Sequence, residues 1–221
     1  MKTLLDKFVD AFGVWEEALP YLPMMVDESE MRLLVAMRGQ AVTIDEAAKL
    51  LGIERAGATD FLQRSYARCI LNKIVEAGTE TYAPANFGQR LDHFAKFENW
   101  DDIPAQDRLA INRRFLDEFI AKHQPDVERK RRGLAAENSL PNDTVMLLSE
   151  IEDMLDAATH IVVQPCDCRQ LGQNCDRPIE TCIWMDDGAL EALDRGHGRL
   201  LTNEEAKELV RWADKKGLMH T

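Results

Sequence analysis

Residues 161–182 read IVVQPCDCRQLGQNCDRPIETC, a short apolar run followed by four cysteines. The apolar run Ile161–Val163 predicts a buried strand, and Pro165 marks its end. A loop that follows a strand is positioned by that rigid element and can therefore present ligands. This stretch predicts that the C-terminal part of the chain is organised around a cysteine-rich loop at a strand end.

The four cysteines, Cys166, Cys168, Cys175 and Cys182, follow the pattern C-x-C-x6-C-x6-C. Thiolates are soft ligands that select iron–sulfur clusters or zinc over hard cations. A [4Fe-4S] cluster is normally held by four cysteines, and the two six-residue loops are long enough to wrap around one. We predict that these cysteines bind one metal centre, a [4Fe-4S] cluster.

Two other readings of the cysteines stay open. A zinc site of four cysteines usually contains C-x2–4-C pairs, whereas this pattern has one tight pair at the shorter C-x-C spacing. Disulfides or free thiols are the third reading, which is uncommon for a close cysteine set in a reducing compartment. The fifth cysteine, Cys69, lies far away in the sequence and is expected to pack in a core.

The charge of the chain limits its partners and its location. The 221 residues carry a net charge of −12, and residues 134–221 contain 8 Lys and Arg against 17 Asp and Glu. An acidic chain has no general attraction for nucleic acid or anionic lipid. No apolar stretch approaches the roughly 20 residues that a bilayer requires. The acidic residues within positions 1–23 fit an amphipathic helix better than a signal peptide. We expect a cytoplasmic protein without membrane contact.

The N-terminal part predicts three short helices followed by a β-hairpin. Residues 28–40 show helical apolar spacing, and Thr43 with Glu46 forms a capping box for a second helix. A third helix is predicted from about Thr59, and residues 70–84 predict two strands around an Ala-Gly turn. This order of elements resembles that of a winged helix-turn-helix.

The predicted fold class is mainly α with small β elements (α+β). Residues 1–123 are expected to form a winged-helix-like domain with a helical connector at its C-terminal end. Residues 143–221 are expected to form the cluster-binding domain. Between them, residues 124–142 are predicted to be a linker, because they carry a proline near each end, a basic run and little apolar periodicity.

DNA is the first partner that a winged helix suggests. The expected recognition helix carries Arg55, Arg64 and Arg68 against Asp60. Sequence-specific DNA-binding proteins usually show a broader basic stripe. We therefore do not favour DNA as a partner, and a winged helix can also serve as a protein-interaction module.

The C-terminal part resembles a family of 4Fe-4S ferredoxin-type iron–sulfur proteins of anaerobic microbes. The shared elements are C-D-C-R at 166–169, C-D-R-P-I-E-T-C at 175–182, G-H-G-R at 196–199 and G-L-M-H at 217–220. The resemblance implies that the four cysteines ligate the cluster. It also implies that Arg169, Arg199 and His220 sit near it.

Members of that family often continue into a ferredoxin domain with two further clusters, whereas this sequence ends at Thr221. We expect the electron relay of such a domain to be missing or to lie on another polypeptide.

The expected function is that of an iron–sulfur protein in electron transfer, or of an accessory to a redox system, with a redox partner protein. The alternative is a redox- or iron-responsive DNA-binding transcription regulator. The sequence contains no P-loop, dinucleotide fingerprint or nucleophile motif, and His93, His123 and His160 are isolated in it. An enzyme that uses the cluster as a Lewis acid would need an open iron site, which four cysteines do not leave. We therefore favour a non-catalytic protein.

Overall fold

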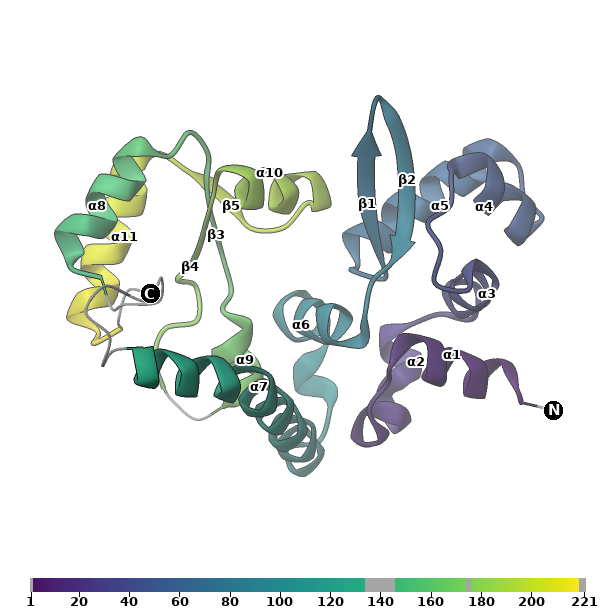
Figure 1. The fold of residues 1–221 in the computed structure, drawn as a ribbon, viewed down its shortest axis with the longest axis horizontal. Coiled ribbons are helices and arrows are strands. Elements are labelled where there is room, and N and C mark those ends of the chain that lie inside the picture. Colours follow the sequence, from purple (N-terminus) through teal and green to yellow (C-terminus); the bar gives the residue numbers. More distant parts are fainter. Residues whose placement is uncertain (1, 134–145, 174–175, 219–221) are drawn as a thin grey trace. The chain divides into compact units, whose positions relative to one another are not determined.

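The computed structural model describes residues 2–133, 146–173 and 176–218 (Figure 1). The structure is mainly helical with two small sheets, which confirms the predicted fold class. It divides into two compact units, which we call the N-terminal unit (residues 1–111) and the C-terminal unit (residues 112–221).

The N-terminal unit consists of helices and one hairpin. Its elements in chain order are α1 (Leu4–Phe12), the 3-10 helix η1 (Glu16–Tyr21), α2 (Leu22–Met25), α3 (Glu28–Met37), α4 (Ile44–Leu51), α5 (Arg55–Ala67), β1 (Leu71–Glu76), β2 (Thr79–Pro84), α6 (Phe87–Phe97), the 3-10 helix η2 (Trp100–Asp102) and the start of α7 (Ala105–Gly133).

Local sequence signals explain these elements. The predicted capping box is confirmed, because Thr43 and Glu46 each bond the other's backbone N–H at the start of α4. Helix α5 begins at Arg55, one turn earlier than predicted from Thr59. The predicted hairpin is also confirmed: β1 and β2 pair antiparallel, and the two turn residues both have positive φ, as a tight hairpin turn requires.

The order α3, α4, α5, β1, β2 matches the predicted succession of three helices and a hairpin. A further backbone contact joins the segment before α4 to the hairpin, since Val42 and Tyr82 exchange two N–H···O bonds of 2.8 Å. Tyr82, Leu62 and Leu71 are fully buried. The hairpin is therefore attached to the helices through its base.

Helix α7 covers the place where the sequence suggested a linker. It runs from Ala105 to Gly133, so residues 124–133 are helical, and the two units divide near its start, after Ile111. The remainder of the predicted linker lies outside the described residues. Pro125 lies inside this helix, where it cannot donate the usual backbone hydrogen bond to the preceding turn.

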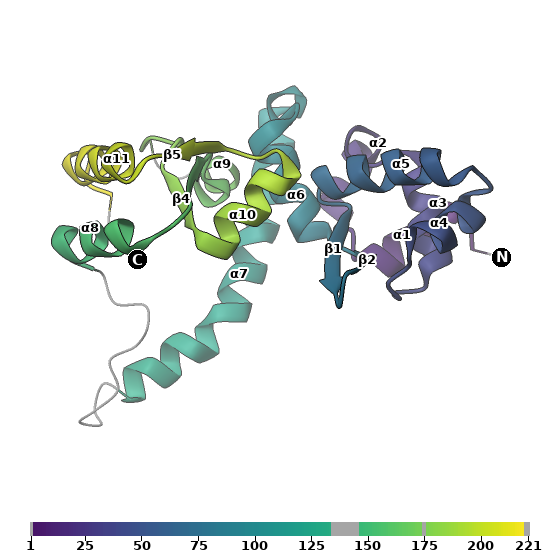
Figure 2. The ribbon, with the colours of Figure 1, turned by 90° about the horizontal axis from the view of Figure 1, so that it is seen from above.

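The C-terminal unit contains the rest of α7 and a three-stranded sheet with helices on both faces (Figures 1 and 2). Its other elements are α8 (Leu148–Ala157), β3 (Ile161–Gln164), α9 (Asp167–Gly172), β4 (Cys182–Met185), α10 (Asp186–Arg195), β5 (Arg199–Leu201) and α11 (Asn203–Lys215). The antiparallel strand order is β4-β3-β5, so β3 is central and β4 and β5 are the edges.

Alternate residues of β3 face opposite cores. Ile161 and Val163 pack against Leu155 of α8 and Val210 of α11, whereas Val162 packs against the alanines of α10. The sheet thus has α8 and α11 on one face and α10 on the other. The predicted strand at residues 161–163 is confirmed, and so is the capping box that begins α11 at Thr202.

In the described ranges, none of the helices combines the length and the hydrophobicity needed to cross a bilayer.

Candidate metal centre

The sheet of the C-terminal unit brings two cysteines of the predicted set to one end. Cys182 is the first residue of β4 and pairs with Gln164, the last residue of β3. Cys166 follows β3 by two residues, and its backbone N–H donates to the carbonyl of Ile179 at 2.9 Å. The two cysteines lie sixteen positions apart in the sequence, and antiparallel pairing returns the chain to the same sheet end.

The third described cysteine, Cys168, lies in the first turn of α9. The ligand atoms of Cys166, Asp167 and Cys168 lie within 4.8 Å of one another, so this group could hold a metal ion. The hydrogen bond from the thiol of Cys168, together with the backbone N–H and the charge of Arg169, lowers the pKa of Cys166 to about 6 against the effect of burial. The same hydrogen bond, burial and the nearby Asp167 raise the pKa of Cys168. Of these two thiols, Cys166 therefore loses its proton more readily.

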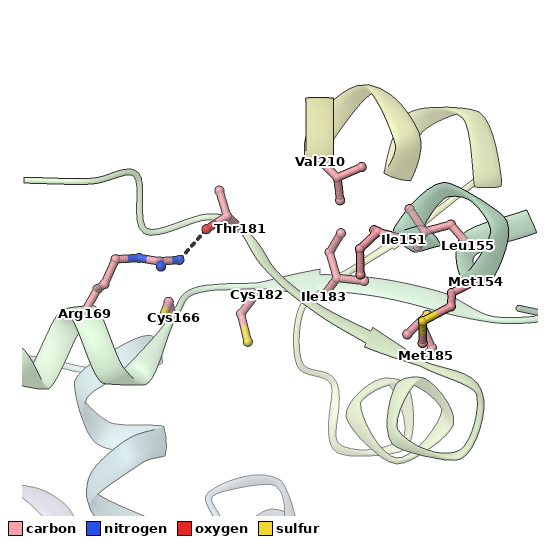
Figure 3. Close-up of a pocket in the computed structure, with 10 residues that line it drawn as sticks. All are labelled: Ile151, Met154, Leu155, Cys166, Arg169, Thr181, Cys182, Ile183, Met185 and Val210. Carbon is pink, nitrogen blue, oxygen red and sulfur yellow. Dashed lines mark hydrogen bonds between the residues drawn. The ribbon is translucent and has the colours of Figure 1, made fainter. Parts of the chain in front are cut away.

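A cavity of about 250 Å³ adjoins these thiols (Figure 3). Its polar lining consists of Cys166, Arg169, Thr181 and Cys182. Its apolar lining comes from the core between the sheet, α8 and α11, and consists of Ile151, Met154, Leu155, Ile183, Met185 and Val210. Two cysteines and one arginine thus line the same cavity as six apolar residues.

Arg169 spans the cysteine loop. Its guanidinium donates to the hydroxyl of Thr181, and that hydroxyl donates to the carbonyl of Pro178 at 3.3 Å (Figure 3). Its Nε is buried and has no acceptor among the residues that the structure describes. A buried donor of this kind beside two thiols suits an anionic group in the cavity.

These observations test whether the residues fit an iron–sulfur cluster. The donor set is soft, the described cysteines come from two segments, the start of α9 and the start of β4, and Arg169 lines the same cavity as Cys166 and Cys182. Cys166, Cys168 and Cys182 would hold the cluster together with Cys175, which lies outside the described residues. The residues fit the group.

The other residues of the family resemblance are placed differently. Arg199 begins β5, is mostly exposed and pairs with Glu205 at 3.5 Å, and it does not line the cavity. His220 lies outside the described residues. The position of Arg199 near a cluster therefore stays a prediction, while Arg169 lines the cavity with two of the cysteines.

The local backbone explains why both residues 196 and 198 of the G-H-G-R motif are glycine. Gly196 ends α10 with a φ of 78°, the left-handed conformation that favours glycine. Gly198 has a φ of 75° and lies so close to β3 that a Cβ would stand 2.6 Å from Val162 Cγ1 and from the carbonyl oxygen of Val163. This motif therefore docks the end of α10 onto the central strand.

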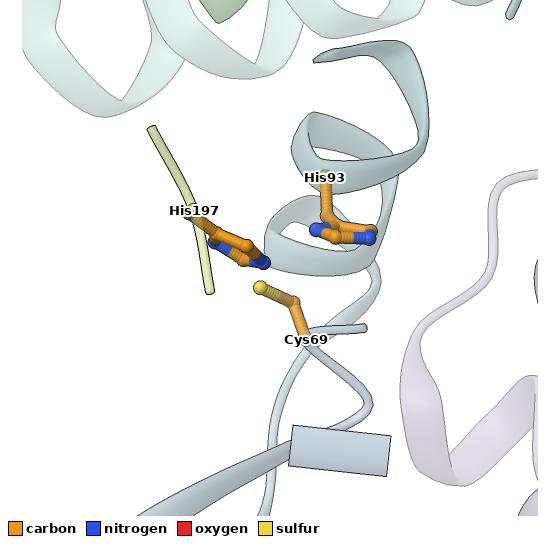
Figure 4. A group of neighbouring side chains, drawn as sticks. All are labelled: Cys69, His93 and His197. Carbon is orange, nitrogen blue, oxygen red and sulfur yellow. The ribbon is translucent and has the colours of Figure 1, made fainter. Parts of the chain in front are cut away.

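A second set of chemically active side chains lies in the N-terminal unit and was missed in the sequence. The sulfur of Cys69 and a ring nitrogen of His93 lie within 4.8 Å of each other (Figure 4). His93 also bonds Glu98 at 3.2 Å, so it is not isolated as its sequence position suggested. Burial lowers the pKa of His93, and the charges of Arg90 and Arg68 add to that effect.

The same region holds a network of buried charges. Arg68 binds the fully buried Glu30 at 2.9 Å, and Arg90, also fully buried, binds Glu98 at 2.6 Å. Both arginines donate to the carbonyl of Met25 at 2.7 Å. Burial raises the pKa of Glu30. Burial also acts to raise the pKa of Glu98, but hydrogen bonds from His93 and Arg90 and the arginine charges outweigh it and hold that pKa at about 2.

Local partners engage the arginines that a DNA-binding helix would use. Of the three arginines expected on the recognition helix, Arg68 is engaged by Glu30, and Arg55 pairs with Asp45 at 2.8 Å. The guanidinium of Arg64 lies 5.5 Å from the ring centre of Phe61. Helix α5 thus offers less free positive charge than its sequence indicated.

Comparison with known proteins adds no family: no protein-family model, curated protein or solved structure matches this chain. The function is therefore inferred from the geometry of the cysteines and their surroundings.

Proposed function

We propose that Cys166, Cys168, Cys175 and Cys182 bind one [4Fe-4S] cluster and that the protein is a cytoplasmic iron–sulfur protein of electron transfer or an accessory to a redox system. The observation that carries the proposal is that three cysteines of the set lie at the same end of the sheet: Cys166 just after β3, Cys168 in the first turn of α9 and Cys182 at the start of β4. Two of them line one cavity, and the third lies within 4.8 Å of the first.

The chain contributes three features to such a centre. The antiparallel pair β3–β4 fixes the separation of Cys166 and Cys182. The apolar wall from α8 and α11 limits the access of water, which influences the potential of a cluster. Arg169 places positive charge beside the thiolates. When bound, a cluster with four cysteine ligands supplies one-electron transfer and leaves no open iron site for catalysis.

Anaerobic purification followed by iron and sulfide analysis and by EPR of the reduced protein tests the proposal. We expect about four iron and four sulfide per chain. Cys166→Ser and Cys182→Ser should each lose most of that iron, whereas Cys69→Ser, outside the predicted set, should keep it. Stoichiometric zinc without sulfide would support the zinc reading instead. A metal-free protein with reactive thiols would overturn both readings.

A redox-responsive regulator of transcription is the second candidate, and the order of α3, α4, α5 and the hairpin β1–β2 favours it. The engagement of Arg55 and Arg68 by carboxylates weighs against it. Retention of the anaerobically purified full chain on DNA, measured at low and at physiological salt, separates the two. Retention at low salt that depends on the oxidation state would favour the regulator, and its absence would exclude it.

A further inference from the structure

We infer that Arg177 is a positioning residue of the proposed metal centre: it fastens the loop between Cys175 and Cys182 to the C-terminal end of α11 and so slows the loss of the metal. The inference rests on the proposed function, because it concerns the same cysteine site. We call residues 176–181 the ligand loop, and we call the contact of Arg177 with the end of α11 the clamp.

The ligand loop has little regular structure of its own. It forms neither helix nor strand between α9 and β4. A backbone hydrogen bond within it joins the N–H of Thr181 to the carbonyl of Ile179 at 2.8 Å. A segment with few internal backbone bonds is held in place by its contacts with the surrounding elements. The anchors of the ligand loop therefore decide how firmly the cysteines at its two ends are positioned.

Two anchors hold the second half of the ligand loop. The backbone N–H of Cys166 donates to the carbonyl of Ile179 at 2.9 Å. The guanidinium of Arg169 donates to the hydroxyl of Thr181 (Figure 3). Both contacts are made in the second half, so neither holds the part of the loop that follows Cys175.

The clamp holds the first half of the ligand loop. The guanidinium of Arg177 donates to the carbonyl of Lys216, the residue that follows α11. A Cβ at Gly217 would stand 3.3 Å from Nη2 of Arg177, so the guanidinium lies against the bare Cα of this glycine. The last carbonyls of a helix carry partial negative charge, which a cation stabilises. Hydrogen bonding and charge thus both tie Arg177 to α11.

The clamp also gives a role to Gly217 of the G-L-M-H motif. Gly217 has a φ of 75°, and its N–H bonds the carbonyl of Asp214 at 2.8 Å. The N–H of Leu218 bonds the carbonyl of Ala213 at 3.1 Å, which completes a Schellman end of the helix. A side chain at Gly217 would strain this backbone and crowd the guanidinium of Arg177. The structure therefore joins two motifs, C-D-R-P-I-E-T-C and G-L-M-H, through one contact.

The clamp acts on the metal centre by limiting local opening. Thiolates release a metal when the segments that carry them move apart, so the release rate depends on how often the ligand loop opens. Loss of the clamp frees the half of the loop that follows Cys175, while the two anchors of the other half remain. Because Arg177 and Lys216 are both exposed, we expect a few-fold effect on release and little effect on global stability.

Iron release from the anaerobically purified full chain to an excess of an iron(II) chelator tests the inference. Arg177→Gln removes the cation and should release iron about fivefold faster. Arg177→Lys keeps a positively charged donor and should recover part of this difference. The matched control Arg211→Gln makes the same charge change on α11, where Arg211 binds Glu152 of α8 at 2.6 Å, and should release iron as the unchanged protein does.

Thermal denaturation of the same variants separates positioning from general stability. The inference requires that Arg177→Gln releases iron faster than Arg211→Gln while the two variants have the same melting temperature. Equal release rates, or faster release that accompanies a matching loss of thermal stability, would overturn it.

Amide hydrogen exchange of the metal-free full chain, followed by mass spectrometry, distinguishes failure of the clamp from failure of the cluster. Arg177→Gln should speed exchange in the ligand loop about threefold and leave β3 unchanged. Where the unchanged protein contains iron, the release rates decide, and equal rates refute only the clamp. Where it contains no iron, the cluster is refuted and the exchange rates decide: faster exchange in the loop supports the clamp, and unchanged exchange overturns it.

Discussion

In the N-terminal unit, the charges of Glu30, Arg68, Arg90 and Glu98 are enclosed by helices and neutralise one another, whereas in the C-terminal unit two thiols and Arg169 face a cavity. In the N-terminal unit, the polar groups bind one another and so hold α3, α5 and α6 together. The C-terminal unit presents polar groups to a space that a ligand can occupy. Buried polar groups indicate a binding site only where the fold leaves their chemistry unused.

Removal of Arg90 should have the largest effect on stability. Arg90→Ala leaves the carboxylate of Glu98 and the carbonyl of Met25 without this donor, and breaking a buried ion pair typically costs about 3–5 kcal/mol. Urea denaturation followed by far-ultraviolet circular dichroism measures the loss. Arg32→Ala, which breaks an exposed pair with Glu28, is the control and should change little. Similar stability of both variants would show that the network does not hold the unit together.

The close approach of Gly198 to β3 predicts the next largest effect. Gly198→Ala forces a methyl group against Val162 and Val163 in addition to an unfavourable φ, and should cost about 3 kcal/mol. Gly196→Ala, at a similar φ but with open space around its Cβ position, should cost about 1 kcal/mol. Thermal denaturation of both variants compares them, and an equal loss would assign the whole effect to backbone strain.

Acid should weaken the N-terminal unit through Glu98. Its pKa is about 2 in the folded protein and near 4.5 when unperturbed, so the stability that its ionised form contributes is complete above pH 4.5 and is lost as the pH falls toward 2. Glu98→Gln should flatten the decline of the unfolding free energy over this range. Denaturant titrations at a series of pH values measure it, and an unchanged slope in the variant would contradict the assignment.

The smallest effect concerns the potential of the proposed cluster. Arg169→Gln should keep the iron but make the midpoint potential more negative, because it removes a cation that stabilises the more anionic reduced state. Arg199→Gln, whose arginine pairs with Glu205, should leave the potential nearly unchanged. Redox titration followed by EPR compares the two. A larger shift for Arg199→Gln would favour the placement that the family resemblance implies.

Much of the fold could be predicted because its signals are local. The capping boxes at Thr43 and Thr202 each join residues three positions apart, and the hairpin follows from an Ala-Gly turn between β-forming stretches. Residues 124–133, the first part of the predicted linker, are helical and belong to α7, which the sequence did not indicate because Pro125 and the lack of an apolar stripe both argue against a helix there.

Part of the candidate site could likewise be predicted from the sequence, and part could not. Sequence spacing selected the four cysteines, the family resemblance added Arg169, and the structure places those that it describes near one cavity. Spacing gave no indication that Arg199 faces Glu205 instead, or that His93 lies beside Cys69. Those contacts join residues that are near in space but not at the spacing of any motif.

The sequence by itself determined the number and spacing of the thiols, the helix caps and the acidic charge, because each depends on composition or on neighbours within one helical turn. Only the tertiary structure decided that Cys166 and Cys182 meet at one end of a sheet, that Arg68 is withdrawn into a buried ion pair, and that Trp184 remains exposed. These outcomes depend on which distant segments pack together. Burial of apolar side chains and strand pairing decide that, and neither can be read from a short stretch of sequence.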